Sequence, residues 1–317
     1  MPFETAETFT PTDGAANARE EFWLLGQPSL TDYLDYVDNA VVGGDAMDRR
    51  TLIDAWRDAN DVYHALETEE EGIADEVEIE SVPDAMAPLV AELEASPLFA
   101  ETFDRMPTAI EMVELDKIVV SQRRVTKTFV DSLARKLTPH PDAAGLFRFC
   151  QPLERRDPPV SIRRLSSGRY LFASESNDLR LLDTTLLRPG QLSSLRNLGP
   201  MAAAVGVVVG YGSNFLSLVR SDDRVVLHNG YHRAVAMRAA GITHAPCIVQ
   251  TVTRRDELEV SAGPAVVEDP AFYFRSRRPP LLKDFFDPRI VTTLKARPFL
   301  KLIEVGVEIR EHNANEA

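Results

Sequence analysis

The stretch from Val225 to Val252 contains the pattern that decides the fold. Residues 225–241 read VVLHNGYHRAVAMRAAG, and the chain continues to residue 252 as ITHAPCIVQTV. The opening β-branched and aliphatic run is typical of a buried strand. Asn229-Gly230 indicates a turn, residues 234–240 are good helix formers, and Gly241 stands where helices commonly end. The apolar run 246–252 then predicts a second strand. The stretch as a whole predicts strand, tight turn, helix and strand.

The turn in this stretch is a candidate anion site. A glycine that leaves a strand and opens a helix exposes backbone N–H groups at the positive end of the helix dipole. His232 and Arg233 fall in the first helical turn, and a guanidinium matches the geometry of phosphate or carboxylate. An ordinary strand–helix junction with a surface arginine and a partly buried histidine would show the same pattern, so the residues alone leave both interpretations open.

The motif formed by Gly230, Arg233 and Ala236 resembles the phosphate-binding segment of the ParB/sulfiredoxin superfamily. ParB proteins carry Gly-x-x-Arg-x-x-Ala there, and sulfiredoxins carry Gly-Cys-His-Arg, which matches Gly230, His232 and Arg233. Tyr231 stands at the place of the reactive cysteine of sulfiredoxins. Without a thiolate at that place, reduction of a sulfinic acid is not expected.

A second part of the resemblance lies upstream. Residues 113–125 (VELDKIVVSQRRV) are similar to the opening strand of the superfamily and the loop after it, where ParB often has Gln-Pro-Arg. A helix over 128–137 is expected to follow. The resemblance covers residues 112–252 with a long insertion. It implies that a nucleotide, ATP or CTP with Mg²⁺, or another small phosphorylated ligand contacts the following residues: Gly230, Tyr231, His232, Arg233, Gln122, Arg123 and Arg124.

Catalysis has weaker support than binding. Phosphoryl chemistry needs a general base or a water-positioning group. The small-molecule kinases of the superfamily have a glutamate after the first strand, and the hydrophobic pattern places Gln122 there. Glu114 and Asp116 are the nearby carboxylates and therefore the candidate catalytic residues. We expect Arg233→Ala to abolish ligand binding with little effect on the fold. The six histidines show neither an HExxH pattern nor a Cys/His pairing, so no metal ligands are expected.

Charge divides the chain near residue 110. Residues 1–110 contain 26 acidic and 5 basic side chains, whereas the remaining residues contain 23 acidic and 30 basic ones. The resemblance implies an α+β protein with a ParB/sulfiredoxin-like mixed sheet and helices. The charge split predicts that an acidic all-helical domain precedes it. The expected parts are a flexible segment 1–20, the helical domain 21–110, the core 111–255 with an insertion at 150–220, and an extension 256–317 with a final strand. Helices are expected at about 30–39, 46–68 and 83–103.

The acidic part would meet either a basic protein partner or the basic remainder of the chain. The basic loop 275–280 would likewise touch phosphates or pair with the acidic part. Two alternatives to nucleotide binding with hydrolysis or phosphotransfer follow. One is a non-enzymatic, ligand-gated scaffold or interaction module. The other is a ParB-type DNA-binding protein, which the net charge of −14 and the missing helix-turn-helix pattern disfavour.

The sequence predicts a cytoplasmic protein. No apolar run reaches bilayer-spanning length, and residues 1–21 do not have the pattern of a signal peptide. The two cysteines, Cys150 and Cys247, lie in apolar runs and are expected to be reduced core residues.

Overall fold

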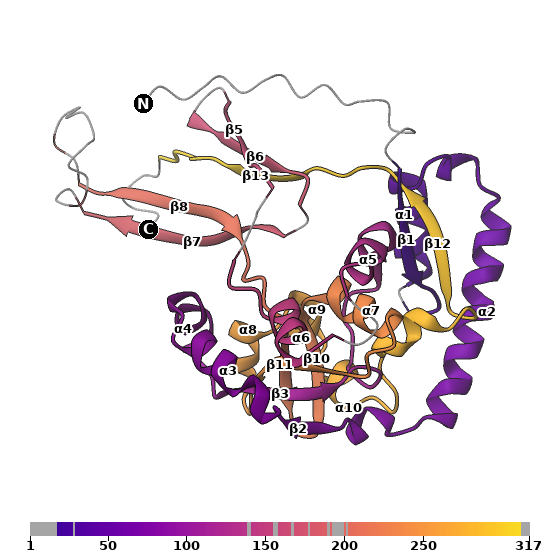
Figure 1. Ribbon diagram of the computed structural model, residues 1–317. Coiled ribbons are helices and arrows are strands. Elements are labelled where there is room, and N and C mark those ends of the chain that lie inside the picture. The colour runs from indigo at the N-terminus through magenta and orange to yellow at the C-terminus, as the bar shows by residue number, and fades with distance from the viewer. Residues whose placement is uncertain are drawn as a thin grey trace. The chain divides into compact units, whose positions relative to one another are not determined.

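The computed structural model describes residues 18–27, 29–137, 141–154, 158–165, 168–176, 178–188, 191, 200 and 202–311 (Figure 1). These residues form two compact units. The main unit contains the described residues of 18–154 and 213–297, and the inserted unit contains those of 158–212 and 298–311. Both helices and sheets are present, which confirms the α+β class.

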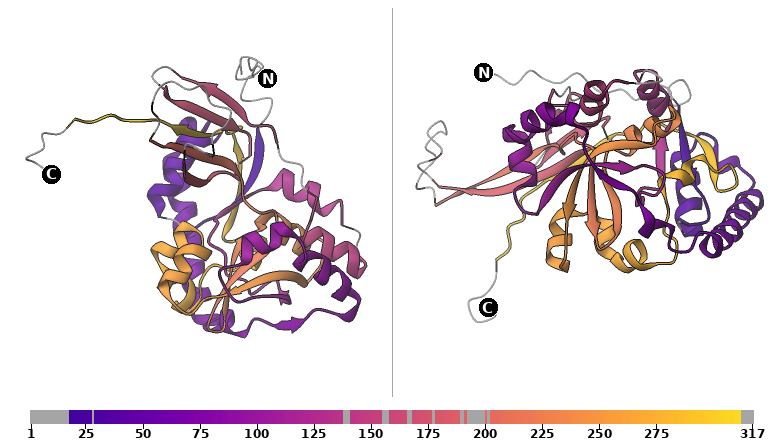
Figure 2. Two further views of the ribbon diagram at one scale, coloured as in Figure 1. Left: turned by 90° about the vertical axis from the view of Figure 1, so that its left-hand side faces the viewer. Right: turned by 60° about the horizontal axis from the view of Figure 1, so that its bottom comes forward.

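The central sheet of the main unit has the strand order β10-β9-β11-β3-β2. Its strands run side by side in the right-hand view of Figure 2. Their bounds are β2 Ile79–Ser81, β3 Thr108–Glu114, β9 Ser217–Ser221, β10 Arg224–Asn229 and β11 His244–Thr251. Strands β9 and β11 are parallel, whereas β10·β9, β11·β3 and β2·β3 are antiparallel. The predicted strand–turn–helix–strand is present as β10, α7 (Tyr231–Ala239) and β11.

A smaller sheet of the main unit joins distant parts of the chain. Its order is β12-β1-β4, with β12 at Val291–Ala296, β1 at Arg19–Leu24 and β4 at Arg124–Thr126. Helices α1 (Leu30–Ala40) and α2 (Arg49–Glu69) pack their apolar sides, including Tyr33 and Leu52, on this sheet. Asp48 caps α2 by accepting hydrogen bonds from the backbone N–H groups of the first turn.

The remaining helices of the main unit are short. They are α3 Ala87–Glu94, α4 Pro97–Phe103, α5 Lys127–Ala134, α6 Ala143–Cys150, α8 Arg255–Ser261, α9 Pro264–Glu268 and α10 Pro270–Arg275. The single helix predicted over 83–103 divides into α3 and α4 because Pro97 starts a new helix. The main core lies around α5, α7 and the central sheet. Both cysteines are buried and free, as expected.

The inserted unit is built from antiparallel strands. One sheet has the order β13-β6-β5, from Lys301–Val305, Tyr170–Ser174 and Ser161–Arg164. The strands β7 (Leu179–Leu187) and β8 (Ala204–Tyr211) form a separate pair. This unit lies within the insertion expected at 150–220, except that β13, the expected final strand, also belongs to it.

The N-terminal segment is not an all-helical domain. Strands β1 and β2 lie within residues 21–110 or begin just before them, and they pair with β12, β4 and β3 from later parts of the chain. The boundary expected at residue 110 therefore falls inside the main unit. Of the segment 1–20 expected to be flexible, residues 1–17 lie outside the described residues, and Arg19 and Glu20 start β1. Pairing with non-local strands decides this outcome, and helical periodicity gives no sign of it.

Candidate functional site at the start of helix α7

Gly230 forms the turn between β10 and α7. Its φ of +95° lies in the left-handed region, which strongly favours glycine. A Cβ on this residue would lie 2.6 Å from Cδ1 of Leu216, so the position is crowded as well. The side-chain oxygen of Asn229 accepts a hydrogen bond from Gly230 N–H at 2.9 Å, and its amide donates to the Ser213 carbonyl. The Asn-Gly pair therefore forms a turn that the Asn229 side chain stabilises through two hydrogen bonds.

The first turn of α7 presents backbone donors. The N–H groups of Tyr231 and His232 have no hydrogen-bond partner within the described part of the chain, as is usual at a helix start. These groups carry the positive end of the α7 dipole. In other proteins, a helix start that follows a strand and a glycine turn often binds an anion.

The side chain of Tyr231 holds a loop against this helix start. Its hydroxyl donates to the Leu227 carbonyl at 2.6 Å and accepts from the backbone N–H groups of Ser121, at 3.2 Å, and Gln122, at 3.3 Å. Tyr231 is buried, and burial raises the pKa of its phenol. Tyr231 thus connects the two segments on which the family resemblance rests, in a structural role.

His232 is a neutral hydrogen-bond acceptor. Its Nε2 accepts from the backbone N–H of Thr126 at 3.0 Å, so Nδ1 carries the proton. The ring also makes an edge contact with Phe129, at 5.2 Å between ring centroids. Burial, assisted by the charge of Arg233, lowers the pKa of His232 to about 4. His232 therefore positions the start of α5 against α7 and carries no positive charge at neutral pH.

The lowered pKa of His232 predicts a pH-dependent stability. An unfolded histidine has a pKa near 6.5, so between pH 6.5 and about 4 the unfolded chain binds a proton that the folded chain does not. The stabilisation is complete above pH 6.5 and is lost as the pH falls towards 4. We expect wild type to lose about 1–3 kcal/mol more than His232→Gln between pH 7 and 4.5, measured by urea unfolding. Glutamine keeps an acceptor without the titration, and parallel pH curves would contradict this assignment.

Arg233 is part of the core. Its side chain is 7% exposed, and Nη1 donates to the backbone carbonyls of Cys150 and Asn214, both at 2.7 Å. These two carbonyls flank the segment that leads into and out of the inserted unit. The guanidinium expected to bind the ligand instead bonds to backbone. Arg233→Ala would leave these buried carbonyls without their donor, so the structure predicts a destabilised fold where the motif predicted little effect.

The three loop residues of the resemblance separate in the structure. Gln122 stays at the start of α7 through its backbone bond to Tyr231, and its side-chain amide donates to the Arg124 carbonyl. The guanidinium of Arg123 lies 3.8 Å from the Asp32 carboxylate. That of Arg124 lies 3.4 Å from the carboxylate of Glu21. Both arginines thus pair with the acidic N-terminal segment.

Neither candidate catalytic carboxylate lies at the start of α7. Glu114 pairs with Lys117 at 3.1 Å, and Asp116 pairs with Arg238 in the last turn of α7. A helix of nine residues is about 13 Å long, so Asp116 lies at the opposite end from Gly230. These ion pairs give the catalytic assignment of Glu114 and Asp116 no support at the start of α7.

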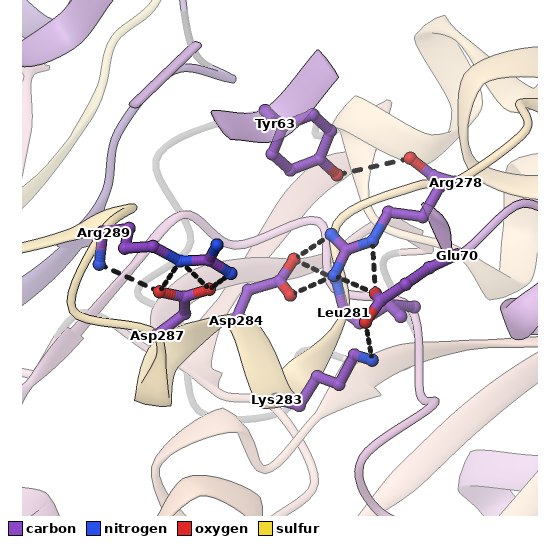
Figure 3. Close-up of polar contacts among 8 residues, drawn as sticks. All are labelled: Tyr63, Glu70, Arg278, Leu281, Lys283, Asp284, Asp287 and Arg289. Atoms are coloured by element: carbon purple, nitrogen blue, oxygen red, sulfur yellow. Dashed lines mark hydrogen bonds and ion pairs between the residues drawn. The ribbon is translucent and has the colours of Figure 1, made fainter. Parts of the chain in front are cut away.

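A buried ion cluster joins α2 to the C-terminal part of the main unit (Figure 3). The guanidinium of Arg278 bonds to Asp284 at 2.6 Å and to Glu70 at 3.0 Å, and Lys283 contacts Glu70 at 2.7 Å. The side chains of Arg278 and Asp284 are 1% and 2% exposed. The basic loop 275–280 is expected either to touch phosphates or to pair with the acidic segment, and Arg278 pairs with the acidic segment. The sequence patterns did not single out Asp284, since an isolated Asp carries no signal of burial.

The described residues contain neither a candidate metal site nor a candidate membrane-spanning helix. No group of three or more His, Cys, Asp or Glu side chains in the described ranges is arranged to hold a metal ion. Among the helices of those ranges, none combines the length and the apolar character that crossing a bilayer requires.

Comparisons with known proteins identify no relative of this chain. Neither protein-family models, nor curated proteins, nor solved structures give a significant match to this chain. Any functional proposal therefore depends on the structure and on the sequence motifs.

Proposed function

We propose that this protein binds a nucleotide or another small phosphorylated ligand at the start of α7. The observation that carries the proposal is the strand–glycine–helix junction, in which Gly230 has a left-handed conformation and the N–H groups of Tyr231 and His232 lack partners. Such a junction favours phosphate through its dipole and its donors. The resemblance to the ParB/sulfiredoxin superfamily points to the same ligand class, with ATP or CTP and Mg²⁺ as the first ligands to test.

The ligand would be held differently from the expectation drawn from the motif. Nη1 of Arg233 is engaged by the carbonyls of Cys150 and Asn214, and His232 is neutral, so backbone donors take the principal role. The loop around Gln122 lies next to α7, because the backbone N–H of Gln122 donates to the hydroxyl of Tyr231. Recognition through backbone donors is common in phosphate sites and requires no charged side chain.

The positions of the candidate catalytic carboxylates favour ligand binding without turnover. Glu114 and Asp116 pair with Lys117 and Arg238 away from Gly230. A ligand-gated scaffold is accordingly the second candidate function. Arg123 and Arg124 support it, because they connect the site loop to Asp32 and Glu21 of the N-terminal segment. A bound anion would compete with these two carboxylates for the arginines. A protein partner of that segment belongs to this candidate.

The test uses charge changes at residue 122. We expect one of ATP, ADP, CTP or GTP, with or without Mg²⁺, to stabilise wild type, by about 2.7 kcal/mol at a concentration of a hundred times Kd. Gln122→Glu places a carboxylate beside the site and should weaken binding about tenfold, whereas Gln122→Lys should strengthen it. Neither change removes a core contact, since the Gln122 side chain is partly exposed. Thermal unfolding with increasing ligand measures both effects.

Two results separate the candidates. Release of product from the stabilising nucleotide would support an enzyme, and its absence combined with faster amide exchange of β1 and α1 on binding would support the scaffold. No stabilisation by any nucleotide or by inorganic phosphate, or equal affinities for Gln122→Glu and Gln122→Lys, would refute the proposed site.

A further inference from the structure

A pocket of about 320 Å³ lies where the parallel strands β9 and β11 end. Ser221 ends β9, and Val252 and Thr253 directly follow β11, so the pocket is at the carboxyl edge of both strands. Ligands of open sheets with parallel strands commonly bind at this edge. The volume is that of a site for a small molecule with one ring.

The walls of the pocket combine apolar and cationic groups. Val252, Leu258, Pro270 and Phe274 supply apolar surface. Three arginines, Arg254, Arg255 and Arg275, also line it, and none of the lining side chains is acidic. A site with an apolar wall and several guanidinium groups is suited to an organic anion.

The three arginines differ in how their charge is balanced. Arg254 pairs with Glu257 at 3.2 Å, and Arg255 pairs with Glu259 at 3.6 Å, on the exposed surface of α8. Arg275 forms no ion pair with any described residue, whereas Arg277, two residues later, lies 3.5 Å from Glu71. The basic loop therefore divides. Arg277 and Arg278 pair with the acidic segment, whereas Arg275 lines the pocket without an ion-pair partner in the described part of the chain.

This pocket is separate from the start of α7. Ser221 and Arg224 lie at one end of the β9–β10 hairpin, and Gly230 follows the other end of β10. Six residues of extended strand span about 20 Å. A ligand of one-ring size in the pocket cannot reach the N–H groups of Tyr231.

We propose that this pocket binds a small organic anion, a carboxylate or phosphate group attached to an apolar body, with Arg275 as the principal charged contact. The apolar body lies against Phe274 and Leu258, and the anionic group faces the arginines. The proposal is independent of nucleotide binding at α7, since the two sites share no residue.

The test titrates the full chain, with methyl-labelled leucine and valine, with phenyl phosphate, benzoate and benzyl alcohol. We expect both anions to shift the methyl resonances of Val252 and Leu258 saturably, with the uncharged alcohol binding at least about tenfold more weakly. The methyl groups of Leu227 and Val235, near α7, should not move with them. Movement of those groups instead would place the anion at the start of α7 and overturn the pocket proposal.

Two variants assign the charged contact. Arg275→Gln should raise Kd for both anions about tenfold, and Arg277→Gln, an equally exposed arginine of the same loop, should leave it unchanged. A preference between phenyl phosphate and benzoate identifies the anionic group. No saturable shift at about 10 mM of either anion would overturn the proposal, as would benzyl alcohol binding as tightly or equal effects of the two variants.

Discussion

Replacing Asp284 with alanine is expected to lower the free energy of unfolding by about 3–5 kcal/mol. Asp284 accepts from Arg278 at 2.6 Å and from the backbone N–H of Leu281 at 2.9 Å, and it is 2% exposed. Without it, the buried guanidinium of Arg278 keeps one carboxylate partner among the described residues, Glu70, and its contact with the ring of Tyr63. Urea unfolding of the full chain at pH 7 measures the loss.

Asp287 provides the matched control, because it pairs with an arginine in the same region (Figure 3). Its partner Arg289 is 57% exposed, and such a pair contributes about 0–1 kcal/mol. Asp287→Ala should therefore cost far less than Asp284→Ala. In the double variant Asp284→Leu with Arg278→Met, apolar groups replace both charges, and most of the stability should return. A loss in Asp284→Ala no larger than that in Asp287→Ala would show that the cluster does not stabilise the fold.

Local sequence signals predicted the junction at Gly230 because each signal acts over a few residues. Asn229-Gly230 requires only the turn that its own backbone makes, and the run 234–240 requires only helix propensity. Strand β10, helix α7 and strand β11 accordingly lie close to their predicted ranges. The helices α1 and α2 follow for the same reason, since their apolar spacing and caps are local.

Side-chain directions at the site could not be predicted in the same way. A motif places Arg233 in the first turn of α7, but the carbonyls that receive its hydrogen bonds belong to Cys150 and Asn214, which are distant in sequence. The partner of Asp116 is likewise set by how the end of α7 packs on the loop after β3. Strands β1 and β2 escape prediction because their pairing partners lie elsewhere in the chain.

The charge asymmetry of the sequence has a structural counterpart within the chain. The carboxylate of Asp75 accepts two hydrogen bonds from Arg224 at the start of β10, and the one from Nη2 is 2.9 Å long. Glu70 forms an ion pair with Arg278. The acidic residues 70–75 therefore neutralise arginines of the basic part. Composition alone indicated attraction between the two parts as one option, and only the fold identifies which charges pair.

Replacing Arg233 with methionine is expected to cost about 2–5 kcal/mol in the free energy of unfolding. Methionine retains the length and apolar volume of the side chain but has no donor for the carbonyls of Cys150 and Asn214. Each buried acceptor left without its bond costs about 1–3 kcal/mol. Arg238→Met on the same helix is the control. Arg238 is partly exposed and pairs with Asp116, so its loss should stay near 1 kcal/mol.

The same variant separates the two roles considered for Arg233. If its role is to hold the chain at the entrance and exit of the inserted unit, Arg233→Met should unfold at lower urea while the folded fraction keeps its affinity for any nucleotide that stabilises wild type. If Arg233 contacts the ligand, affinity should fall at full stability. Calorimetric titration at a temperature where both proteins are folded distinguishes these results, because Kd then refers to the folded state alone. The 2.7 Å bonds to two backbone carbonyls favour the first result, because they commit Nη1 of Arg233 to buried backbone.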